Sequence, residues 1–401
     1  MADIIPIAAQ SNGSTRLPMI LTGQALMSLR DSGFDLPTAL AEVVDNSIEA
    51  RASKIQIRLD KSESQGKKHV HRIIIGDDGA GMDTDLLHHY LQIGYSTRYM
   101  SKNTIGKYGV GAKLAALNFG KRIDVWSRDN PQGAWQHVFF DLAKAMAEEG
   151  ATGVFTGIEA PTLESVPADI AELAPSGSGT VVVWSDVDRL EDGRVAADFD
   201  SLLVDLKKEL SRIFREFLDG GIGIEVNGTK LLPHDPLFLM HGTWAEKILL
   251  KEPRAKDGHP SKDAPVTEAM VIADEEVKVK GSVARLRVTL YPECITRKRG
   301  LGGDKLAEKL RVPDNEGQIS FMRMRREIAY TNVPRILPSG VQNPDRFIGI
   351  EVSFDPTLDD FFGVRNVKRG VEPHGELRDK IRELLPKYMP QARKTIDERR
   401  G

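Results

Sequence analysis

Apolar and polar positions along the first half of the chain predict both helices and strands. Apolar residues at helical spacing predict helices at Gly23 to Arg30 and at Pro37 to Ala52, with Asp35 as the cap of the second. Alternating apolar residues predict strands, and the polar residues 60–68 predict a hairpin loop between the first two. The predicted strands are Lys54 to Leu59, His71 to Ile75, Arg122 to Ser127, Trp135 to Asp141 and Thr180 to Ser185. Because most of these strands are joined by hairpin-length loops, we expect an α+β fold with helices on one face of a sheet.

The second half begins with an amphipathic stretch, Asp198 to Leu218, which predicts a helix that ends at Gly220-Gly221. Further predicted elements are strands at Ile222 to Val226, Val277 to Leu290 and Phe347 to Phe354, a surface loop at residues 251–265, and a closing helix at Glu376 to Arg393. We therefore expect an α+β domain at residues 1–195, a connecting helix at 196–220 and a smaller α+β domain at 221–401.

Composition narrows the class of protein. With 40% apolar and 28% charged residues the chain is typical of globular proteins, and a formal net charge of −3 gives nucleic-acid binding no support. Cys294 is the only cysteine, which excludes an intrachain disulfide and a cysteine-based zinc cluster, and the nine histidines show no zinc-site spacing. Met1 to Gln10 lacks the pattern of a signal peptide, and no apolar run is long enough to cross a membrane. We expect a cytoplasmic protein with no membrane partner.

Four polar residues of the second predicted helix share one face. Glu42, Asp45, Asn46 and Glu49 stand at positions i, i+3, i+4 and i+7. A solvated acidic face is common on helices and needs no function. A carboxylate and an amide one turn apart also suit chemistry, because the amide oxygen can bind Mg²⁺ while the carboxylate orients a water molecule. The helix by itself leaves both interpretations open.

A glycine-rich turn follows the strand predicted at His71 to Ile75. It contains the pattern D-x-G-x-G at Asp77, Gly79 and Gly81, and Met82 comes next. A tight turn explains the glycines without any ligand. The functional interpretation is that the carboxylate at the strand end accepts the exocyclic amine of adenine, while the missing side chains let the backbone approach the ring.

A second glycine-rich segment, Gly106 to Lys113, leads directly into the helix predicted at Leu114 to Asn118. Glycine amides at the start of a helix form an anion site suited to a polyphosphate. The segment is not a Walker loop, because Gly106-Lys107 is followed by Tyr108, and the chain lacks the motif set of protein kinases.

The order and spacing of these motifs carry more information than each motif alone. Glu-x-x-x-Asn on a helix is followed about thirty residues later by D-x-G-x-G, and about thirty residues further by G-x-x-G-x-G. With a Gly-Thr at the head of a later strand, this set resembles the nucleotide site of the gyrase, heat-shock chaperone, histidine kinase and MutL superfamily, the GHKL ATPases. The resemblance implies a Bergerat-type ATP-binding domain, with a largely antiparallel sheet and helices on one face, followed by a transducer-like domain. Its cofactors would be ATP and Mg²⁺.

The resemblance also implies roles for single residues. Glu42 would be the general base that activates the attacking water, Asn46 the Mg²⁺ ligand, and Asp77 the acceptor of the adenine amine. The residues expected to contact the nucleotide or its metal are Asp45, Asn46, Asp77, Gly79, Gly81, Met82, Ser96, Thr97, Gly106, Lys107, Tyr108, Gly109, Val110, Gly111, Lys113 and Thr180.

The resemblance implies a phosphate-binding lid that begins near Gly94 and includes Gly106, Gly109 and Gly111. It is rich in Ser, Thr, Asn and Gly, as expected of a loop that orders around a ligand. Lys107 and Lys113 are each either a phosphate contact or a solvated lysine. Thr180 would support the base pocket from its strand.

In the second half, the segments Phe347 to Phe354 and Asp359 to Arg369 resemble a strand and loop of MORC-type and heat-shock-type members. The resemblance implies a catalytic lysine that reaches the terminal phosphate, and Lys368 is our candidate; a solvent-facing basic loop is the alternative. The basic clusters at residues 297–299, 323–326 and 365–369 suit either a nucleic-acid backbone or ordinary surface charge.

The function implied by the resemblance is an ATP-operated dimerisation clamp of MORC type, which would close a homodimer over DNA or a DNA-associated partner. The alternative is a heat-shock-type chaperone ATPase that acts on protein clients, since members of the superfamily share the site. A histidine kinase is disfavoured because the first histidine, His69, follows the Glu42 motif. A gyrase-type topoisomerase would need breakage domains, for which we expect no room after residue 390.

Overall fold

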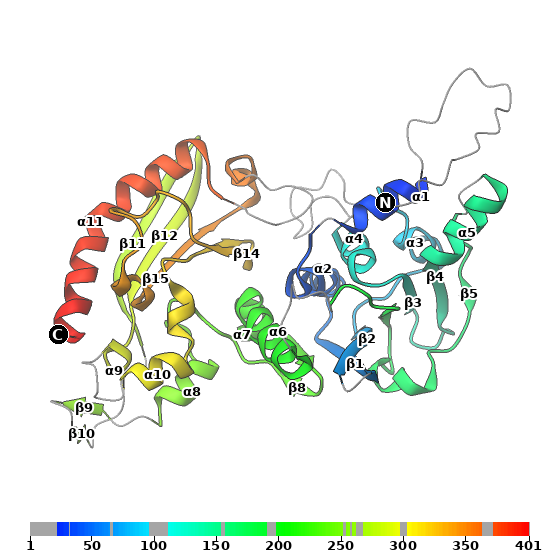
Figure 1. The fold of residues 1–401 in the computed structure, drawn as a ribbon, viewed down its shortest axis with the longest axis horizontal. Helices are drawn as coiled ribbons and strands as arrows, with labels where there is room; N and C mark the ends of the chain where they lie inside the picture. Colours follow the sequence, from blue (N-terminus) through cyan, green and yellow to red (C-terminus); the bar gives the residue numbers. More distant parts are fainter. Residues whose placement is uncertain are drawn as a thin grey trace, which may run out of the picture.

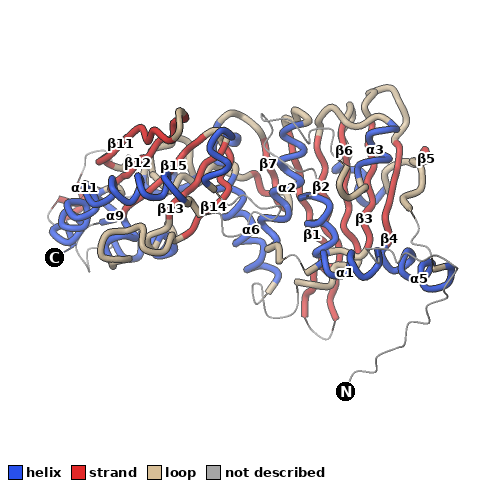
Figure 2. Tube along the Cα trace, turned by 90° about the horizontal axis from the view of Figure 1, so that it is seen from above, coloured by secondary structure: helices blue, strands red, loops and turns tan. Residues whose placement is uncertain are grey.

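A computed structural model describes residues 22–31, 33–64, 67–95, 111–153, 157–190, 198–251, 254–256, 259–261, 268–296, 303–362 and 372–400. Within these residues the strands form an eight-stranded sheet, a five-stranded sheet and a small two-stranded sheet. Figures 1 and 2 show the two large sheets beside each other along the long axis, and Figure 1 shows helices α6 (Phe199–Ile213) and α7 (Arg215–Asp219) between them. The α+β fold predicted from the sequence is confirmed.

The first sheet has the strand order β5-β4-β3-β6-β2-β1-β7-β8. Every adjacent pair is antiparallel except β1 and β7, which are parallel. The strands are β1 (Lys54–Ser64), β2 (Lys67–Asp77), β3 (Arg122–Arg128), β4 (Gln136–Asp141), β5 (Thr162–Leu163), β6 (Gly179–Ser185), β7 (Gly223–Val226) and β8 (Thr229–Lys230).

Helices cover one face of this sheet and build the main core. Ile73 and Ile75 of β2 belong to that core, whereas Ile74 between them belongs to a smaller cluster on the opposite face. The helices of this half are α1 (Thr22–Arg30), α2 (Leu36–Glu49), α3 (Thr84–Tyr90), α4 (Gly111–Phe119), α5 (Leu142–Thr152), η1 (Ala168–Leu173), α6 (Phe199–Ile213) and α7 (Arg215–Asp219). The alternation of apolar residues along β2 thus separates the two layers, as strand geometry requires.

Helix α2 is the centre of the core. Asp35 caps it, as predicted, by accepting a hydrogen bond from the backbone N–H of Thr38 (2.8 Å). Leu36, Leu40 and Val44 are fully buried, and burial of each such side chain stabilises the fold by about 1.5–3 kcal/mol. The polar residues of α2 are therefore held in place by a well-packed helix.

Two predictions about the first sheet were wrong. Strand β1 continues to Ser64 and β2 begins at Lys67, so most of the hairpin loop predicted at residues 60–68 is paired strand. Lys61, Ser62 and Glu63 are exposed, so the backbone pairs there although the sequence has no alternating apolar residues that would predict a strand. The strand predicted at Ile222 to Val226 exists as β7, but it pairs with β1 and so belongs to the first sheet, not to the second domain. The domain limits themselves remain a prediction.

The second sheet has the order β11-β12-β15-β13-β14. Helix α11 (Gly375–Arg400) packs against it, continuing beyond the predicted end at Arg393 and through two internal prolines. The strands are β11 (Met270–Val279), β12 (Ser282–Leu290), β13 (Ile319–Arg323), β14 (Arg326–Thr331) and β15 (Ile348–Phe354). Smaller elements of this half are α8 (Trp244–Leu249), β9 (Arg254–Lys256), β10 (His259–Ser261), α9 (Glu293–Thr296), α10 (Gly303–Lys309), η2 (Val312–Asn315), η3 (Asn343–Phe347) and η4 (Pro356–Phe361).

The single strand predicted at Val277 to Leu290 is two strands. They are joined by a tight turn at Lys280 and Gly281, whose φ angles of 45° and 83° match the primed turns that suit a two-residue hairpin. The pattern also missed the β13–β14 hairpin, and β9 and β10 lie within the stretch predicted as a surface loop. Among the described residues, no helix is both long and apolar enough to span a bilayer.

A buried network of charges joins α6 and α7 to the second sheet. The guanidinium of Arg215 donates to Glu327 (2.9 Å), Glu351 (2.8 Å) and the hydroxyl of Ser320 (2.7 Å). Arg212 donates to the other oxygen of Glu327 (2.6 Å). Burial pushes the pKa of Glu327 up, but the charges of Arg212 and Arg215 outweigh burial and the pKa is lowered. The second sheet is thus joined to α6 and α7 through buried ion pairs.

Candidate functional site

The polar face of α2 is not a solvated acidic face. Glu42 is only 9% exposed and Asp45 only 2%, whereas Asn46 is exposed. Buried carboxylates in proteins require partners, because an isolated buried charge is costly. This burial favours the functional interpretation of the helix motif.

Asp77 lies at the end of β2, against α2. The hydroxyl of Ser47 donates to one carboxylate oxygen (2.8 Å), and the backbone N–H of Gly79 donates to the other (2.9 Å). Burial raises the pKa of Asp77 although these two hydrogen bonds oppose the shift. A further donor from a ligand, such as an amine, would therefore stabilise the carboxylate form. Ser47, which the sequence analysis did not select, connects the helix motif to the D-x-G-x-G turn.

Both glycines of the turn are required by close packing. A Cβ atom at Gly79 would lie 2.9 Å from the Cβ of Ala50 at the end of α2. Gly81 has a φ of 71°, and a Cβ atom there would lie 2.6 Å from the carbonyl carbon of Arg128. The tight-turn explanation therefore accounts for Gly79 and Gly81, and their contact with a base stays a prediction.

Hydroxyl groups link Met82 to Thr180 across the sheet. The N–H of Met82 donates to the hydroxyl of Ser127 (2.9 Å), which lies 3.0 Å from the hydroxyl of Thr180. Thr180 in turn stands opposite Asp77 in the β2–β6 pairing. The residues of the predicted base pocket thus lie together. Ser127 joins them, and the sequence analysis missed it because a single serine within a strand carries no motif.

Tyr90 of α3 brings the predicted metal ligand close to Asp77. Its hydroxyl hydrogen-bonds to Asn46 and lies within the field of the Asp77 carboxylate, and burial raises the pKa of Tyr90 to about 12. The phenol therefore stays neutral at physiological pH and serves as a hydrogen-bond donor or acceptor. It was also missed, since a tyrosine in a short helix carries no motif.

The third motif meets the first where α4 begins. A Cβ atom at Gly111 would lie 2.8 Å from the carboxyl carbon of Glu42 and 3.3 Å from its Cγ, so a larger residue there would displace this side chain. Because Gly111 opens α4, the carboxylate of Glu42 lies at the start of that helix. This contact places the predicted base beside the predicted phosphate-binding segment.

Lys113 has backbone partners in this structure. Its ammonium group donates to the carbonyls of Gln92 (2.6 Å) and Tyr95 (2.9 Å), and burial lowers its pKa to about 8. The side chain thus ties α4 to the start of the predicted lid. Its contact with a phosphate stays a prediction.

Several candidate residues lie outside the described residues. They are Ser96, Thr97, Gly106, Lys107, Tyr108, Gly109, Val110 and Lys368, together with the basic clusters at 297–299 and 365–369.

The remaining basic cluster, residues 323–326, is not a solvent-facing patch. Arg323 donates two hydrogen bonds to Asp359 (2.7 and 2.9 Å) and is buried. Arg326 is also buried, and its Nε lies 3.1 Å from a carboxylate oxygen of Asp45. The nucleic-acid interpretation was therefore wrong for these two arginines. Both form internal ion pairs, although their polar sequence context is also typical of a surface.

The site agrees with a comparison with known families. Residues 34–180 match the model of a family described as histidine kinase-, DNA gyrase B-, and HSP90-like ATPase. Residues 34–180 are a GHKL-type ATPase domain. The matched range contains Glu42, Asp77 and Gly111, so the family suggested by the sequence motifs is confirmed for this domain.

Individual relatives match a short part of the chain. The chain is 34% identical over 91 residues to Protein MICRORCHIDIA 7 of Arabidopsis thaliana, which covers 22% of this chain and 13% of that protein. It is 37% identical over 91 residues to ATPase MORC2A of Mus musculus, covering 22% of this chain and 9% of that one. The chain thus matches only a small share of each relative.

The fold likeness extends beyond the ATPase domain. A crystal structure described as the N terminal domain of a DNA repair protein aligns with a TM-score of 0.50 at 16% identity. The alignment covers 92% of this chain and 98% of that chain, and so includes both large sheets. At this identity the likeness concerns the fold alone.

Proposed function

We propose that this protein is a Mg²⁺-dependent ATP hydrolase that works as a nucleotide-gated dimerisation clamp. The observation that carries the proposal is the contact between Glu42 and Gly111, which joins the predicted base to the predicted phosphate-binding segment. The match of residues 34–180 to the ATPase family supports it.

In this proposal Asp77 accepts a hydrogen bond from the exocyclic amine of adenine. The carboxylate already holds two donors, from Ser47 and Gly79, and it is buried, so an added donor is favourable. Thr180 and Ser127 hold the strand edge next to it. The base is thereby selected by hydrogen bonding at the end of β2.

Glu42 accepts a proton from the water that attacks the terminal phosphate. Glu42 suits this role because it is buried and lies at the start of α4, beside the predicted phosphate-binding segment, and the water must be positioned for in-line attack. The leaving group is ADP. Lys368 is proposed to contact the terminal phosphate from the second half of the chain, and Lys113 holds the base of the lid.

Asn46 fits the requirements of a Mg²⁺ ligand. Asn46 is exposed on α2 one turn after Glu42, and its amide offers an oxygen. A bound Mg²⁺ would neutralise charge on the phosphates of ATP.

The clamp function rests on similarity. The chain is similar to MORC proteins over 91 residues, and the fold of both sheets is similar to a domain of a DNA repair protein. We propose that ATP drives two chains to dimerise over DNA or a DNA-associated partner. A chaperone that acts on protein clients is the alternative, favoured by the heat-shock-type ATPases within the matched family.

Three measurements test the proposal. Glu42→Ala should bind a non-hydrolysable ATP analogue but lose most turnover, and Asp77→Asn should weaken binding itself. Light scattering should detect dimers when the analogue is added at micromolar protein concentration. A chain that stays monomeric would refute the clamp, and normal turnover by Glu42→Ala would refute the assignment of the base. Stimulation of turnover by DNA, rather than by an unfolded protein client, distinguishes the two functions.

A further inference from the structure

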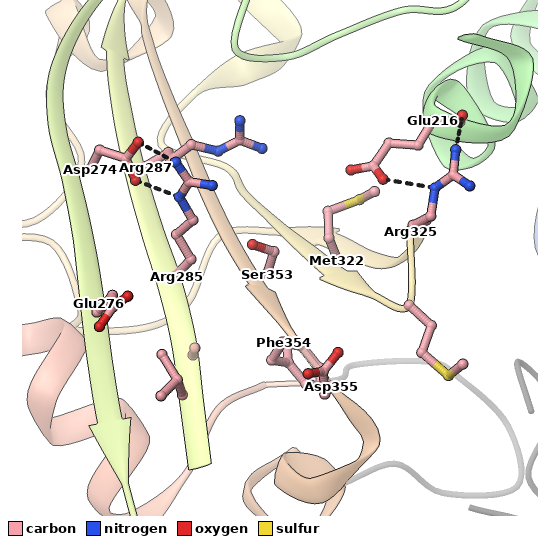
Figure 3. A pocket seen from close by; sticks show the side chains of 13 residues that line it. Glu216, Asp274, Glu276, Arg285, Arg287, Met322, Arg325, Ser353, Phe354 and Asp355 are labelled. Carbon is pink, nitrogen blue, oxygen red and sulfur yellow. Dashed lines mark hydrogen bonds and ion pairs between the residues drawn. The ribbon is translucent and has the colours of Figure 1, made fainter. Parts of the chain in front are cut away.

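The β13–β14 hairpin reaches from the second sheet to the ATPase domain. Its two turn residues, Met324 and Arg325, have φ angles of 49° and 69°, in the left-handed region that non-glycine residues seldom adopt. Arg325 is held by α7: its guanidinium donates to the carbonyl of Glu216 (2.7 Å) and lies 5.2 Å from the ring centre of Phe217. Figure 3 shows the contact between Arg325 and Glu216 at the edge of a groove of about 810 Å³. These contacts hold the turn of the hairpin against α7.

The residue after this turn, Arg326, points onto α2. Its Nε lies 3.2 Å and 3.1 Å from the two carboxylate oxygens of Asp45, and its Nη2 lies 3.9 Å from a carboxylate oxygen of Glu42. Its Nη1 donates to the carbonyl of Glu327, which fixes the plane of the guanidinium. Arg326 is 2% exposed.

This arrangement puts one cation from the second sheet against two carboxylates of one helix turn. Asp45 and Glu42 are three residues apart on α2, and two buried carboxylates at that spacing repel each other. A guanidinium offsets that repulsion: it hydrogen-bonds to Asp45, whose position its rigid fork restricts, and it lies at ion-pair distance from Glu42. Glu42 is therefore confined between Gly111 of α4 and Arg326 of β14.

We propose that Arg326 is a positioning residue for ATP hydrolysis: it holds Glu42 in the orientation for proton transfer, so that turnover requires the second sheet to be seated on α2. This inference rests on the proposed role of Glu42 as the base. Arg326 need not touch the nucleotide. Its loss should lower the rate of hydrolysis and leave nucleotide binding nearly unchanged, because adenine recognition is at Asp77.

The test compares two buried arginines of the same hairpin in the full-length chain. Arg326→Gln removes the contact with α2. Arg323→Gln is the matched control, because it removes an equally buried pair with Asp359 that stays within the second half of the chain. The measurements are kcat for ATP, the Kd of a non-hydrolysable ATP analogue, and the thermal unfolding temperature of each variant.

We expect Arg326→Gln to reduce kcat by tenfold or more while the Kd of the analogue changes less than about threefold, a loss typical of a misplaced catalytic group. Arg323→Gln should lower the unfolding temperature comparably, with kcat per folded molecule within about twofold of the wild type. Arg326→Lys keeps the charge without the fork and should recover part of the rate; it also provides the test if Arg326→Gln fails to fold.

A double mutant locates the effect. If Arg326 acts through the carboxylates of α2, Asp45→Asn and Arg326→Gln together should lower kcat less than the product of their separate effects. The proposal is overturned if Arg326→Gln has the kcat of Arg323→Gln, if its kcat exceeds that of the wild type, or if Arg326→Lys folds and has wild-type kcat. Normal turnover by Glu42→Ala would instead remove the proposed base, whatever the behaviour of Arg326→Gln.

Discussion

Replacement of Gly111 by alanine tests the contact between the predicted base and the predicted phosphate-binding segment. The added Cβ would lie 2.8 Å from the carboxyl carbon of Glu42, where two carbon atoms normally stay about 3.5–4.0 Å apart. The carboxyl group must therefore move by at least about 0.7–1.2 Å, because one of its oxygens would lie closer still. It is the end of a flexible side chain, so the fold should survive while the base is displaced.

A displacement of about 1 Å at a catalytic group is expected to cost roughly 100-fold in rate, or about 2.7 kcal/mol of transition-state stabilisation. We expect Gly111→Ala to lose about that factor in kcat and to keep a similar thermal unfolding temperature. Steady-state ATP hydrolysis and calorimetric binding of a non-hydrolysable analogue measure the two quantities.

Gly150→Ala is the matched control. Gly150 lies in α5, and a Cβ atom there meets no other atom within 4 Å, so alanine should be neutral for turnover and should stabilise the helix by up to about 1 kcal/mol. If Gly111→Ala hydrolyses ATP within about twofold of the wild type, Glu42 is not confined as described or is not the base.

Three further predictions concern protonation and the link between the sheets. Because burial raises the pKa of Asp77, affinity for an adenine nucleotide should fall as pH drops through that raised pKa, and calorimetry should find this dependence missing in Asp77→Asn. Burial and the charge of Arg212 lower the pKa of His234 to about 3, below the unfolded value of 6.5, so the unfolded chain binds the extra proton and stability is lost as pH falls below about 6.5. His234→Gln should lose less stability in urea titrations between about pH 6.5 and pH 5; an unchanged slope against pH would contradict this. Arg215→Met should lower the free energy of unfolding by about 3–5 kcal/mol in the same titrations, because the buried carboxylates of Glu327 and Glu351 would each lose a partner. A loss under about 1 kcal/mol would show that the network is dispensable.

The site illustrates how far local patterns reach. The cap at Asp35 and the periodicity of α2 identified that helix, and the glycine motifs identified the ATPase domain. They succeeded because each depends on residues within a few positions of one another: a cap needs its first turn, and a phosphate-binding turn needs its own glycines. The ends of β1 and β2 within residues 60–68 carry polar side chains, so no alternating pattern predicted that they form strands.

Sequence by itself therefore determined the class of fold, the ATPase family and the identity of its central motifs. Tertiary structure alone decided which other side chains complete the site. Ser47, Ser127 and Tyr90 carry no motif, and Arg326 lies 281 residues from its partner Asp45. A charged residue in a polar turn has the same local pattern whether it faces solvent or a buried carboxylate, because burial and charge pairing depend on the packing of distant elements.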